Sequence, residues 1–414
     1  MNRKAIAWAT FDWANSAFPT VVSTFVIAAY FSQGIAPDPA TGQAQWGWMQ
    51  TVAAVCIALL SPVLGALADN GGRRMMLAAC TLVTAACTAL VWFALPDPSW
   101  TLYVLVCVGL ATIAFEIGTV FYNAMLPEVT TPEHLGRVSG LAWGLGYAGG
   151  LVCLGVALVL LIQPNPALFG LDRAESEHVR ATALLVGAWT LVFAWPVLMF
   201  VPDRPGARLP PGQAVAACLA DTKRLIQGLP QRPDMLRFLV ARLFYTDGLN
   251  TLFAFGAIYA AGVHGMGMED ILLFGIALNV TAGLGAAGFG LIDDRIGAKR
   301  VVMIALVCMV VLGAALLLTA SVTWFWALAM ALGIFMGPAQ AASRTLMAQM
   351  APDGQCASHF GLFALSGRIT GFLGPAVLAA VTAATGSQAL GMSTVLVFLA
   401  LGAVILATVR PVRG

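Results

Sequence analysis

Long apolar stretches recur along the whole chain of 414 residues, and only single polar residues or short polar loops interrupt them. A helix of about twenty apolar residues crosses the hydrocarbon core of a bilayer, which is roughly 30 Å thick. The pattern predicts twelve membrane-spanning helices, at residues 11–32, 46–68, 75–95, 100–123, 139–162, 182–201, 238–261, 271–292, 301–320, 323–343, 359–384 and 388–409. We therefore expect an all-α integral membrane protein.

The longest polar connection divides the predicted spans into six and six. It predicts an N-terminal half at residues 1–201, a cytoplasmic central loop at 202–236 and a C-terminal half at 237–414. Since each half has an even number of spans, both halves enter the membrane from the same side. The halves are then two parallel six-helix repeats, related by an axis along the membrane normal.

Basic residues gather in the loops on one side of the predicted bundle. Lys and Arg are favoured in cytoplasmic loops next to membrane helices, so we expect both termini and the central loop in the cytoplasm. The basic residues of this side are Arg3, Lys4, Arg73, Arg74, Arg137, Arg204, Arg208, Lys223, Arg224, Arg232, Arg237, Arg295, Lys299, Arg300, Arg344, Arg410 and Arg413. Arg173 and Arg180 fall in a loop on the other side.

The composition supports a membrane protein and excludes several other classes. Hydrophobic residues make up 60% of the chain and charged residues only 10%, against about 25% charged residues in soluble domains. The net charge of +2 gives no indication of a nucleic-acid partner. The eight cysteines have no metal or redox spacing, and no phosphate-binding loop or His-Glu-x-x-His motif is present. We expect no cofactor, no metal and no enzymatic activity.

One loop motif occurs twice. "GALADNGGRRMML" follows the second predicted span and "GLIDDRIGAKRVVM" follows the eighth, and both read Gly-x-x-x-Asp-x-x-Gly with basic residues after them. Glycine lets a helix end pack closely, and Asp69 or Asp294 can accept hydrogen bonds from a helix N-terminus. A single copy is compatible with an ordinary turn, whereas two copies at equivalent places favour a repeat.

A polar stripe on the first span repeats on the seventh. "FDWANSAF" matches "TDGLNTLF", and in each the Asp, Asn and Ser or Thr share one helical face. The stripes are Asp12, Asn15 and Ser16, and Asp247, Asn250 and Thr251. A carboxylate at mid-bilayer costs about 2.5 to 3.5 kcal/mol on insertion scales, so one interpretation is that these faces line a water-filled pathway. The other is that the carboxylates lie at the interface and cap their helices.

Further polar residues lie inside the predicted spans. We place Glu116, Thr119, Asn123, Asn279, Gln340 and Arg368 on the substrate or proton pathway as well. Glu116 either carries a proton, binds the ammonium group of a substrate or pairs with a basic residue of another span. Arg368 either meets a carboxylate or an anionic substrate group, or packs beside the loop at 65–77. Asn279 is favoured as a hydrogen-bonding residue between helices.

Charges of both signs in the cytoplasmic loops suggest a gate. The candidates are Asp69, Arg73, Arg74, Glu128, Arg137, Asp294, Arg295, Arg300 and Arg344. One interpretation is a charge network that closes the inner face, and the other is a set of solvated pairs worth about 0 to 1 kcal/mol each. The repetition of these charges in both halves favours the gate.

The sequence resembles the major facilitator superfamily over its whole length. The doubled loop motif is similar to that superfamily's loop signature. The segments "DWANSAFPTVVSTFV", "FYNAMLPEV", "WGLGYAGG", "ARLFYTDGLNTLFAFGAIYAAG" and "GPAQAASRTLMAQMAPDG" are similar to its unknown-major-facilitator subfamily. That subfamily includes the vacuolar effluxers linked to autophagy.

The resemblance implies a transporter of small polar solutes, with spans one, four, seven and ten around a central cavity. It implies amino acid export by alternating access, with proton coupling left open. The bacterial-looking, short-looped chain implies a monomer in the inner (plasma) membrane whose partners are a small-molecule substrate and the lipid bilayer.

A drug/proton antiporter is the alternative function. Span five reads "GLAWGLGYAGG", whereas the antiporter signature of the superfamily has a Gly-Pro before a Gly-Gly pair. Gly146 replaces that proline here. Close helix packing explains the glycines without antiport.

Overall fold

The computed structural model describes residues 2–70, 72–203 and 211–410, and nearly all of them are helical. Arg204, Arg208 and Arg413, which contributed to the predicted topology, lie outside the described residues.

The first half contains six long helical segments. The first segment is made of α1 (Arg3–Asn15), η1 (Phe18–Phe25), α2 (Ile27–Tyr30) and η2 (Phe31–Ile35). The others are α3 (Pro39–Asp69), α4 (Arg73–Leu90) with η3 (Val91–Phe93), η4 (Pro98–Trp100) with α5 (Thr101–Ala124), α7 (Leu135–Ala157) with η6 (Leu158–Ile162), and α8 (Glu177–Phe200). The short turns α6 (Leu126–Val129), η5 (Pro132–His134) and η7 (Leu168–Gly170) lie between them.

The second half repeats this arrangement. Its spans are α10 (Pro233–His264), α11 (Met268–Ile296), α12 (Ala298–Leu318), α13 (Val322–Met350), α14 (Cys356–Arg368) with α15 (Leu373–Thr385), and α16 (Gln388–Ala407). Between the halves lie α9 (Pro211–Gly228) and η8 (Leu229–Gln231). The predicted central loop therefore contains a helix, and the eleventh span is two helices with a break at 369–372.

Eleven helical segments of the described ranges are long and apolar enough to cross a membrane. The 32-residue α10 occupies the place of the predicted seventh span. The prediction of an all-α membrane protein with two six-helix repeats is confirmed, while the domain boundaries within the chain stay a prediction. The first span begins earlier than predicted, at Arg3, where the side chain of Asn2 caps the helix.

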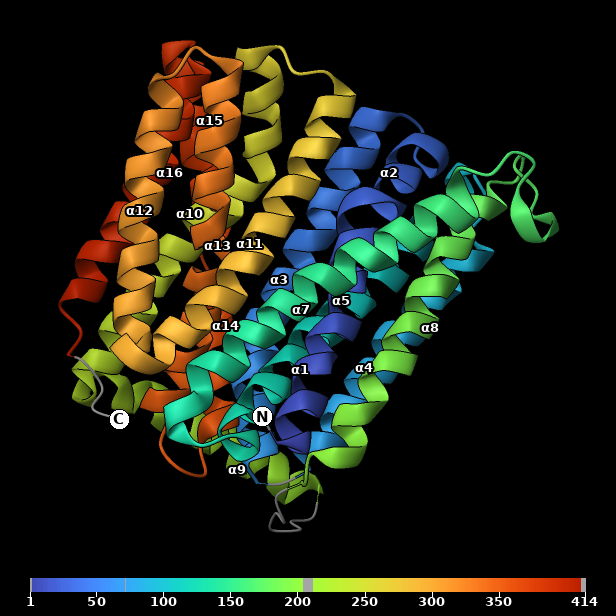
Figure 1. Ribbon diagram of the computed structural model, residues 1–414. Helices are drawn as coiled ribbons and strands as arrows, with labels where there is room; N and C mark the ends of the chain where they lie inside the picture. Colours follow the sequence, from blue (N-terminus) through green and yellow to red (C-terminus); the bar gives the residue numbers. More distant parts are fainter. Residues whose placement is uncertain (1, 71, 204–210, 411–414) are drawn as a thin grey trace.

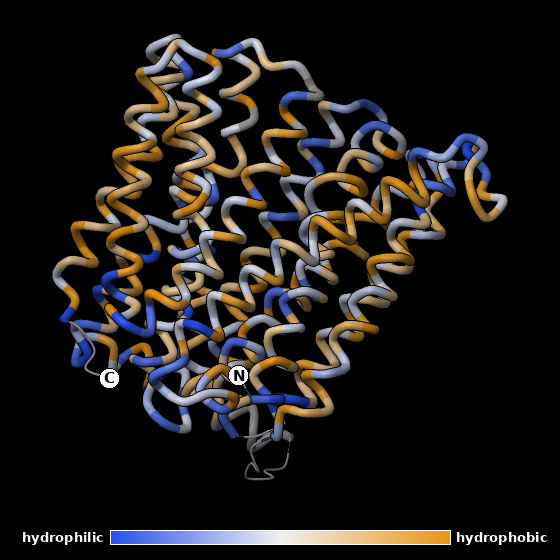
Figure 2. Tube along the Cα trace, viewed as in Figure 1, coloured by the Kyte–Doolittle hydropathy of each residue, from blue (hydrophilic) through white to orange (hydrophobic). Residues whose placement is uncertain are grey.

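The two halves lie side by side, with helices from residues 3–200 on one side and from 233–407 on the other (Figure 1). The beginning of α1, the end of α16 and α9 lie at one end of the bundle, which we call the terminal face. The loop at 163–176 lies at the other end, the opposite face. Figure 2 shows apolar colouring along the helices and hydrophilic segments at the terminal face. Across the junction, α3 packs against α14 and α7 packs against α11.

The doubled loop motif explains the close contact of the halves. A Cβ atom at Gly65 would lie 2.4 Å from the carbonyl oxygen of Ala357, and one at Gly290 would lie 2.8 Å from that of Gly136. The last glycine of each copy, Gly72 or Gly297, has a positive φ, of 82° or 90°, which favours glycine. The first glycine thus permits close packing, and the last permits the turn into the next helix.

Candidate functional site

Arg344 of α13 is the centre of a buried cluster between the halves. Its Nη1 donates to Asp12 Oδ2 at 3.0 Å and to Asn123 Oδ1 at 3.3 Å. Its Nε donates to Ser139 Oγ at 2.9 Å, and its Nη2 donates to the carbonyl oxygen of Ser139 at 2.7 Å. Helices α1, α5 and α7 of the first half therefore all bind one guanidinium of the second half.

Three aromatic rings surround the same guanidinium. Their centroids lie 4.8 Å away for Trp8 and 5.6 Å away for both Tyr122 and Trp143. Ring faces attract a cation most strongly where water is excluded. The rings and the hydrogen bonds together offset the cost of burying Arg344, which is 3% exposed.

Asp12 is therefore an ion-pair partner and not a helix cap. The side chain of Asn2 caps α1 instead, by accepting a hydrogen bond of 2.8 Å from the Ala5 N–H. The capping interpretation for Asp12 is wrong, because its carboxylate lies three turns further along the chain and faces Arg344.

A second ion pair joins the halves deeper in the membrane. Arg368, at the end of α14, contacts the Glu116 carboxylate of α5. The side chains are 36% and 20% exposed, so neither is completely covered by the rest of the protein. Arg368 is the thirteenth residue of the 30-residue span Cys356–Thr385 and lies well inside the membrane segment. The structure therefore supports the interpretation in which Arg368 pairs with a carboxylate, and not the one in which it packs beside the loop at 65–77.

The two loop aspartates cap helices of the other half. Asp69 accepts hydrogen bonds of 2.8 Å from the backbone N–H groups of Ala357 and Ser358, at the start of α14. Asp294 accepts one of 3.0 Å from the Arg137 N–H, at the start of α7. A carboxylate at a helix N-terminus satisfies unpaired N–H groups and the positive end of the helix dipole. The repeated motif thus forms two equivalent contacts across the terminal face.

Charged side chains extend the first of these caps. Arg73 is buried and pairs with Asp69 and with Glu128, and its Nη1 also donates to the Ala124 carbonyl at 3.2 Å. Arg137 does not join this network. It pairs with Asp294 at 3.5 Å, and its own side chain is 45% exposed.

The α9 helix also covers the terminal face. Thr222 of α9 donates to the Pro62 carbonyl of α3 at 3.4 Å. Arg232, just before α10, contacts the Nε2 atom of His359 on α14 at 3.2 Å. These contacts, with the two caps and the Arg344 cluster, join the halves at the terminal face.

The remaining predicted residues lie apart from these clusters. Asn15 donates to Thr119 Oγ1 at 3.4 Å, and Gln340 donates to the Tyr147 hydroxyl at 3.3 Å. Asn279 donates to the Gly275 carbonyl of its own helix at 2.8 Å. Ser16 lies against α7, and Thr251 donates to the Asp247 backbone carbonyl. The backbone N–H of Arg74 donates to the side chain of Asp203. Three further residues are exposed, namely Asn250, Arg295 and Arg300.

The polar stripes therefore differ in their contacts. Asp12 binds across the junction to Arg344, whereas Asp247 stays within its own half and accepts a hydrogen bond of 2.9 Å from the Gly374 N–H. The equivalent sequence positions do not form equivalent contacts.

Sequence reasoning missed Ser139 and the aromatic rings around Arg344. Aromatic residues are common in membrane helices, and nothing in the pattern distinguishes Trp8, Tyr122 and Trp143 from rings that face lipid. In the segment "GRVSG", Ser139 follows the loop residue Arg137 by two positions. This nearby charge is the signal in the sequence that could have identified Ser139.

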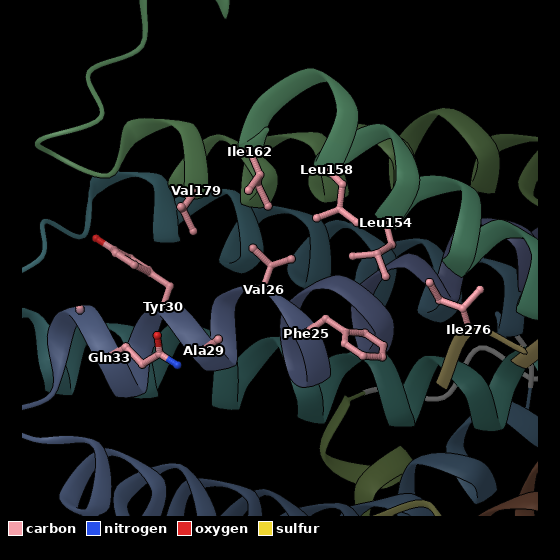
Figure 3. Close-up of a pocket in the computed structure, with 11 residues that line it drawn as sticks. Phe25, Val26, Ala29, Tyr30, Gln33, Leu154, Leu158, Ile162, Val179 and Ile276 are labelled. Carbon is pink, nitrogen blue, oxygen red and sulfur yellow. The ribbon is translucent and has the colours of Figure 1, made fainter. Parts of the chain in front are cut away.

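An apolar cavity of about 460 Å³ lies towards the opposite face. Figure 3 shows its lining side chains, which come from η1, α2, η2, α7, η6 and α8, with Ile276 from the second half. Phe25, Tyr30, Leu154 and Leu158 are among them. None of the predicted pathway residues belongs to its described lining.

Two parallel six-helix halves joined at one face are the fold of the major facilitator superfamily, whose members are secondary transporters and not enzymes. FucP in its outward conformation is similar, with a TM-score of 0.77 at 13% identity over 99% of this chain and 100% of that one. The proton:xylose symporter XylE bound to 6-bromo-6-deoxy-D-glucose has a TM-score of 0.75 at 13% identity, over 99% and 96%. At these identities the likeness shows the fold alone.

Residues 47–414 match the family described as "Vacuole effluxer Atg22 like", and the chain belongs to this family. It is 26% identical to the uncharacterized MFS-type transporter YxiO of Bacillus subtilis (strain 168), over 97% of this chain and 94% of that protein. It is 25% identical to autophagy-related protein 22 of Cryptococcus neoformans, over 67% of this chain and 51% of that protein. The match therefore spans about half the length of the fungal relative.

Proposed function

We propose that the protein exports amino acids across a bacterial plasma membrane by alternating access. The observation that carries the proposal is the Glu116–Arg368 pair. It places one anion and one cation of opposite halves side by side within the membrane, and both remain partly exposed. A free amino acid carries an ammonium group and a carboxylate, and these match Glu116 and Arg368 respectively.

Binding would then exchange one contact for two. The substrate ammonium group replaces Arg368 at Glu116, and the substrate carboxylate replaces Glu116 at Arg368. The direct link between α5 and α14 is lost in this exchange. A ligand shifts a conformational equilibrium only by its differential affinity for the two states, and loss of this link favours separation of the halves at the terminal face.

The orientation belongs to the same proposal. The terminal face carries the basic loops, so it would be the cytoplasmic side. The membership of the vacuole effluxer family supports export, and the bacterial relative supports a plasma membrane. The protein would work as a monomer.

A thermal-shift measurement on the purified protein tests the substrate class. An intact amino acid should raise the midpoint of unfolding, because a ligand of the native state stabilises it. The amide of the same amino acid lacks the carboxylate and its N-acetyl form lacks the ammonium group, so both should give a much smaller shift.

The variants Glu116→Gln and Arg368→Gln should lose the response to the intact amino acid. Arg224→Gln, which removes a cation of α9 that is 78% exposed, is the matched control and should keep it. Equal shifts with all three compounds, or an unchanged response in both pair variants, would contradict the proposal.

The apolar cavity of Figure 3 favours a second candidate function, the drug/proton antiporter. Its apolar lining suits a lipophilic cation better than a zwitterion, whose charges would remain without partners there. A shift of the unfolding midpoint with lipophilic cations, in the absence of one with amino acids, would favour this function.

A further inference from the structure

The break in the eleventh span is capped by a carboxylate from another helix. The α14 helix ends at Arg368 and α15 begins at Leu373. Gly374 is the second residue of α15, and its N–H is one of the first four of a helix, which have no partner within it. Asp247 of α10 supplies that partner through Oδ2, at 2.9 Å.

The other oxygen of this carboxylate is buried without a hydrogen bond. Asp247 is 1% exposed, and its Oδ1 has no hydrogen-bond partner among the residues that the structure describes. The nearby Thr251 hydroxyl donates to the Asp247 backbone carbonyl at 2.8 Å, so it does not donate to Oδ1. Half of the carboxylate is thus buried without a compensating hydrogen bond, and there a charge is costly.

The three arginines within the spans of the second half have partners other than Asp247. Arg242, on the same helix, donates to Ser366 Oγ at 2.9 Å and lies 3.4 Å from the Phe363 ring centroid. Arg368 contacts Glu116 and Arg344 binds Asp12. The other titratable groups on α10, α11, α13 and α14 are Asp234, Arg237, Tyr245, Tyr259, His264, Glu269, Asp270, Asp293, Asp294, Arg295, Cys356 and His359. The α15 and α16 helices contain no Asp, Glu, Lys, Arg or His.

The space around Asp247 suits a proton and not a metal ion. A Cβ atom at Gly374 would lie 2.2 Å from Thr251 Oγ1 and 3.0 Å from Asp247 Oδ1, so α10 and α15 are already in close contact. A metal ion such as Ca²⁺ needs six to eight oxygen ligands, whereas a proton needs one oxygen and no added space.

We propose that Asp247 is a proton-binding site that controls the break in the eleventh span. The Gly374 N–H and the dipole of α15 stabilise the ionised carboxylate. Protonation removes the buried negative charge, whose desolvation destabilises the ionised form. Protonation forms one O–H bond at Oδ1 and breaks none in the protein. The proton comes from water on the side to which the transporter is open.

The break connects this site to the proposed substrate site, and so the inference rests on the proposed function. Arg368 and Gly374 lie on either side of residues 369–372. Neutralising Asp247 weakens the cap of α15, which allows α15 to shift against α14. Such a shift changes how firmly Arg368 holds Glu116, and proton binding and amino acid binding are then coupled.

Infrared difference spectra between high and low pH test the proton site directly. Exposed carboxyl groups also give carbonyl bands at low pH, so the signal to follow is the component from a buried protonated carboxyl group. The wild-type protein should show this component, and Asp247→Asn should lack it. Glu116→Gln and Gly256→Ala should keep the band. Gly256 is the matched control, because it lies on the same helix and a Cβ there meets nothing within 4 Å.

Proton flux in proteoliposomes provides the second measurement. An outward amino acid gradient should drive a pH change with wild-type protein. Asp247→Asn, whose amide oxygen can still accept from Gly374, should exchange amino acids but move no protons. An unaltered band or unaltered proton flux in this variant would overturn the inference, and so would sodium dependence that Asp247→Asn removes.

The two proposals fail in different ways. If the band belongs to Asp247 but no amino acid moves, the proton site stands and the proposed substrate is wrong. If amino acids move while the spectrum lacks a band from Asp247, the substrate stands and this inference is wrong.

Discussion

Arg344 is the residue at which most of the buried polar contacts between the halves meet. It binds Asp12, Asn123 and Ser139 of three different helices. In a medium without water, a guanidinium needs this many acceptors, because an unpaired buried charge is far more costly than a paired one. The cluster therefore holds the halves together only while all its members are present.

Removing the guanidinium should destabilise the protein strongly. Arg344→Gln leaves the Asp12 carboxylate buried without its cation, and breaking a buried pair in this way costs about 3 to 5 kcal/mol. The double variant with Asp12→Asn should recover part of the loss, because no uncompensated charge remains. Thermal unfolding of the four proteins gives the coupling, and additive losses would show that Asp12 and Arg344 do not act as a pair.

At the residue scale the sequence identified the charged residues better than their partners. Intramembrane charges are rare, so Asp12, Glu116, Asp247 and Arg368 could all be recognised from hydropathy alone. Their partners depend on which helices face one another, and the matching stripes misled here. Asp12 reaches an arginine of the other half, whereas Asp247 reaches a helix end created by a break.

At the scale of elements, glycines determine how closely the helices of the two halves approach. A Cβ atom at Gly140 of α7 would lie 2.4 Å from the Ala286 carbonyl oxygen and 2.7 Å from Gly290 Cα on α11. At Gly155, on the same helix, a Cβ atom would meet nothing within 4 Å.

Gly140→Ala should therefore lower the thermal stability and Gly155→Ala should not. An added methyl group in a tight contact costs about 1 to 3 kcal/mol, and here it pushes α7 and α11 apart. The measurement is the midpoint of thermal unfolding in one detergent. Equal midpoints for the two variants would contradict the packing described for the junction.

The cap from Asp69 offers a test of gating at the terminal face. Asp69→Ala removes the acceptor of the first N–H groups of α14, which alone costs about 1 kcal/mol, and it also removes the carboxylate that pairs with Arg73. It should therefore open this face more often. The buried Cys356, directly at the start of α14, should then react faster with a maleimide.

The matched control is Asp97→Ala. Asp97 caps η4 by accepting from the Ser99 N–H at 2.8 Å, but it lies outside the terminal face. It should leave the labelling rate of Cys356, read from its own peptide by mass spectrometry, unchanged. An unchanged rate in Asp69→Ala as well would mean that the cap does not restrain the terminal face.

Most spans could be predicted from hydropathy, because lipid requires long apolar helices and each loop breaks the pattern. Two features of the fold could not be predicted from hydropathy. The α9 helix is amphipathic and lies in a polar segment, so its sequence resembles a loop. The break at 369–372 has the sequence "ITGF", which is as apolar as a helix, and hydropathy does not register it.

At the scale of the whole molecule, the two halves are fastened at the terminal face by contacts that repeat. Asp69 caps α14 and Asp294 caps α7, so each half holds the other through the same loop motif. The Arg344 cluster and the Glu116–Arg368 pair continue the connection into the membrane. This arrangement is closed at the terminal face.

We predict that the terminal face is cytoplasmic. A membrane-impermeant thiol reagent added to intact cells should label Phe169→Cys, which is exposed at the opposite face, and should not label Lys223→Cys of α9. Both should be labelled after the membrane is permeabilised. Labelling of Lys223→Cys in intact cells would invert the orientation.

The central claim is that the two halves carry amino acids between them at the Glu116–Arg368 pair, and counterflow tests it most directly. Proteoliposomes with purified protein are loaded with an unlabelled amino acid and placed in a trace of the labelled one. Wild-type protein and Gly155→Ala should accumulate the label transiently, and Glu116→Gln and Arg368→Gln should not. Failure of the wild-type protein to accumulate any amino acid, or equal accumulation in all four proteins, would contradict the claim.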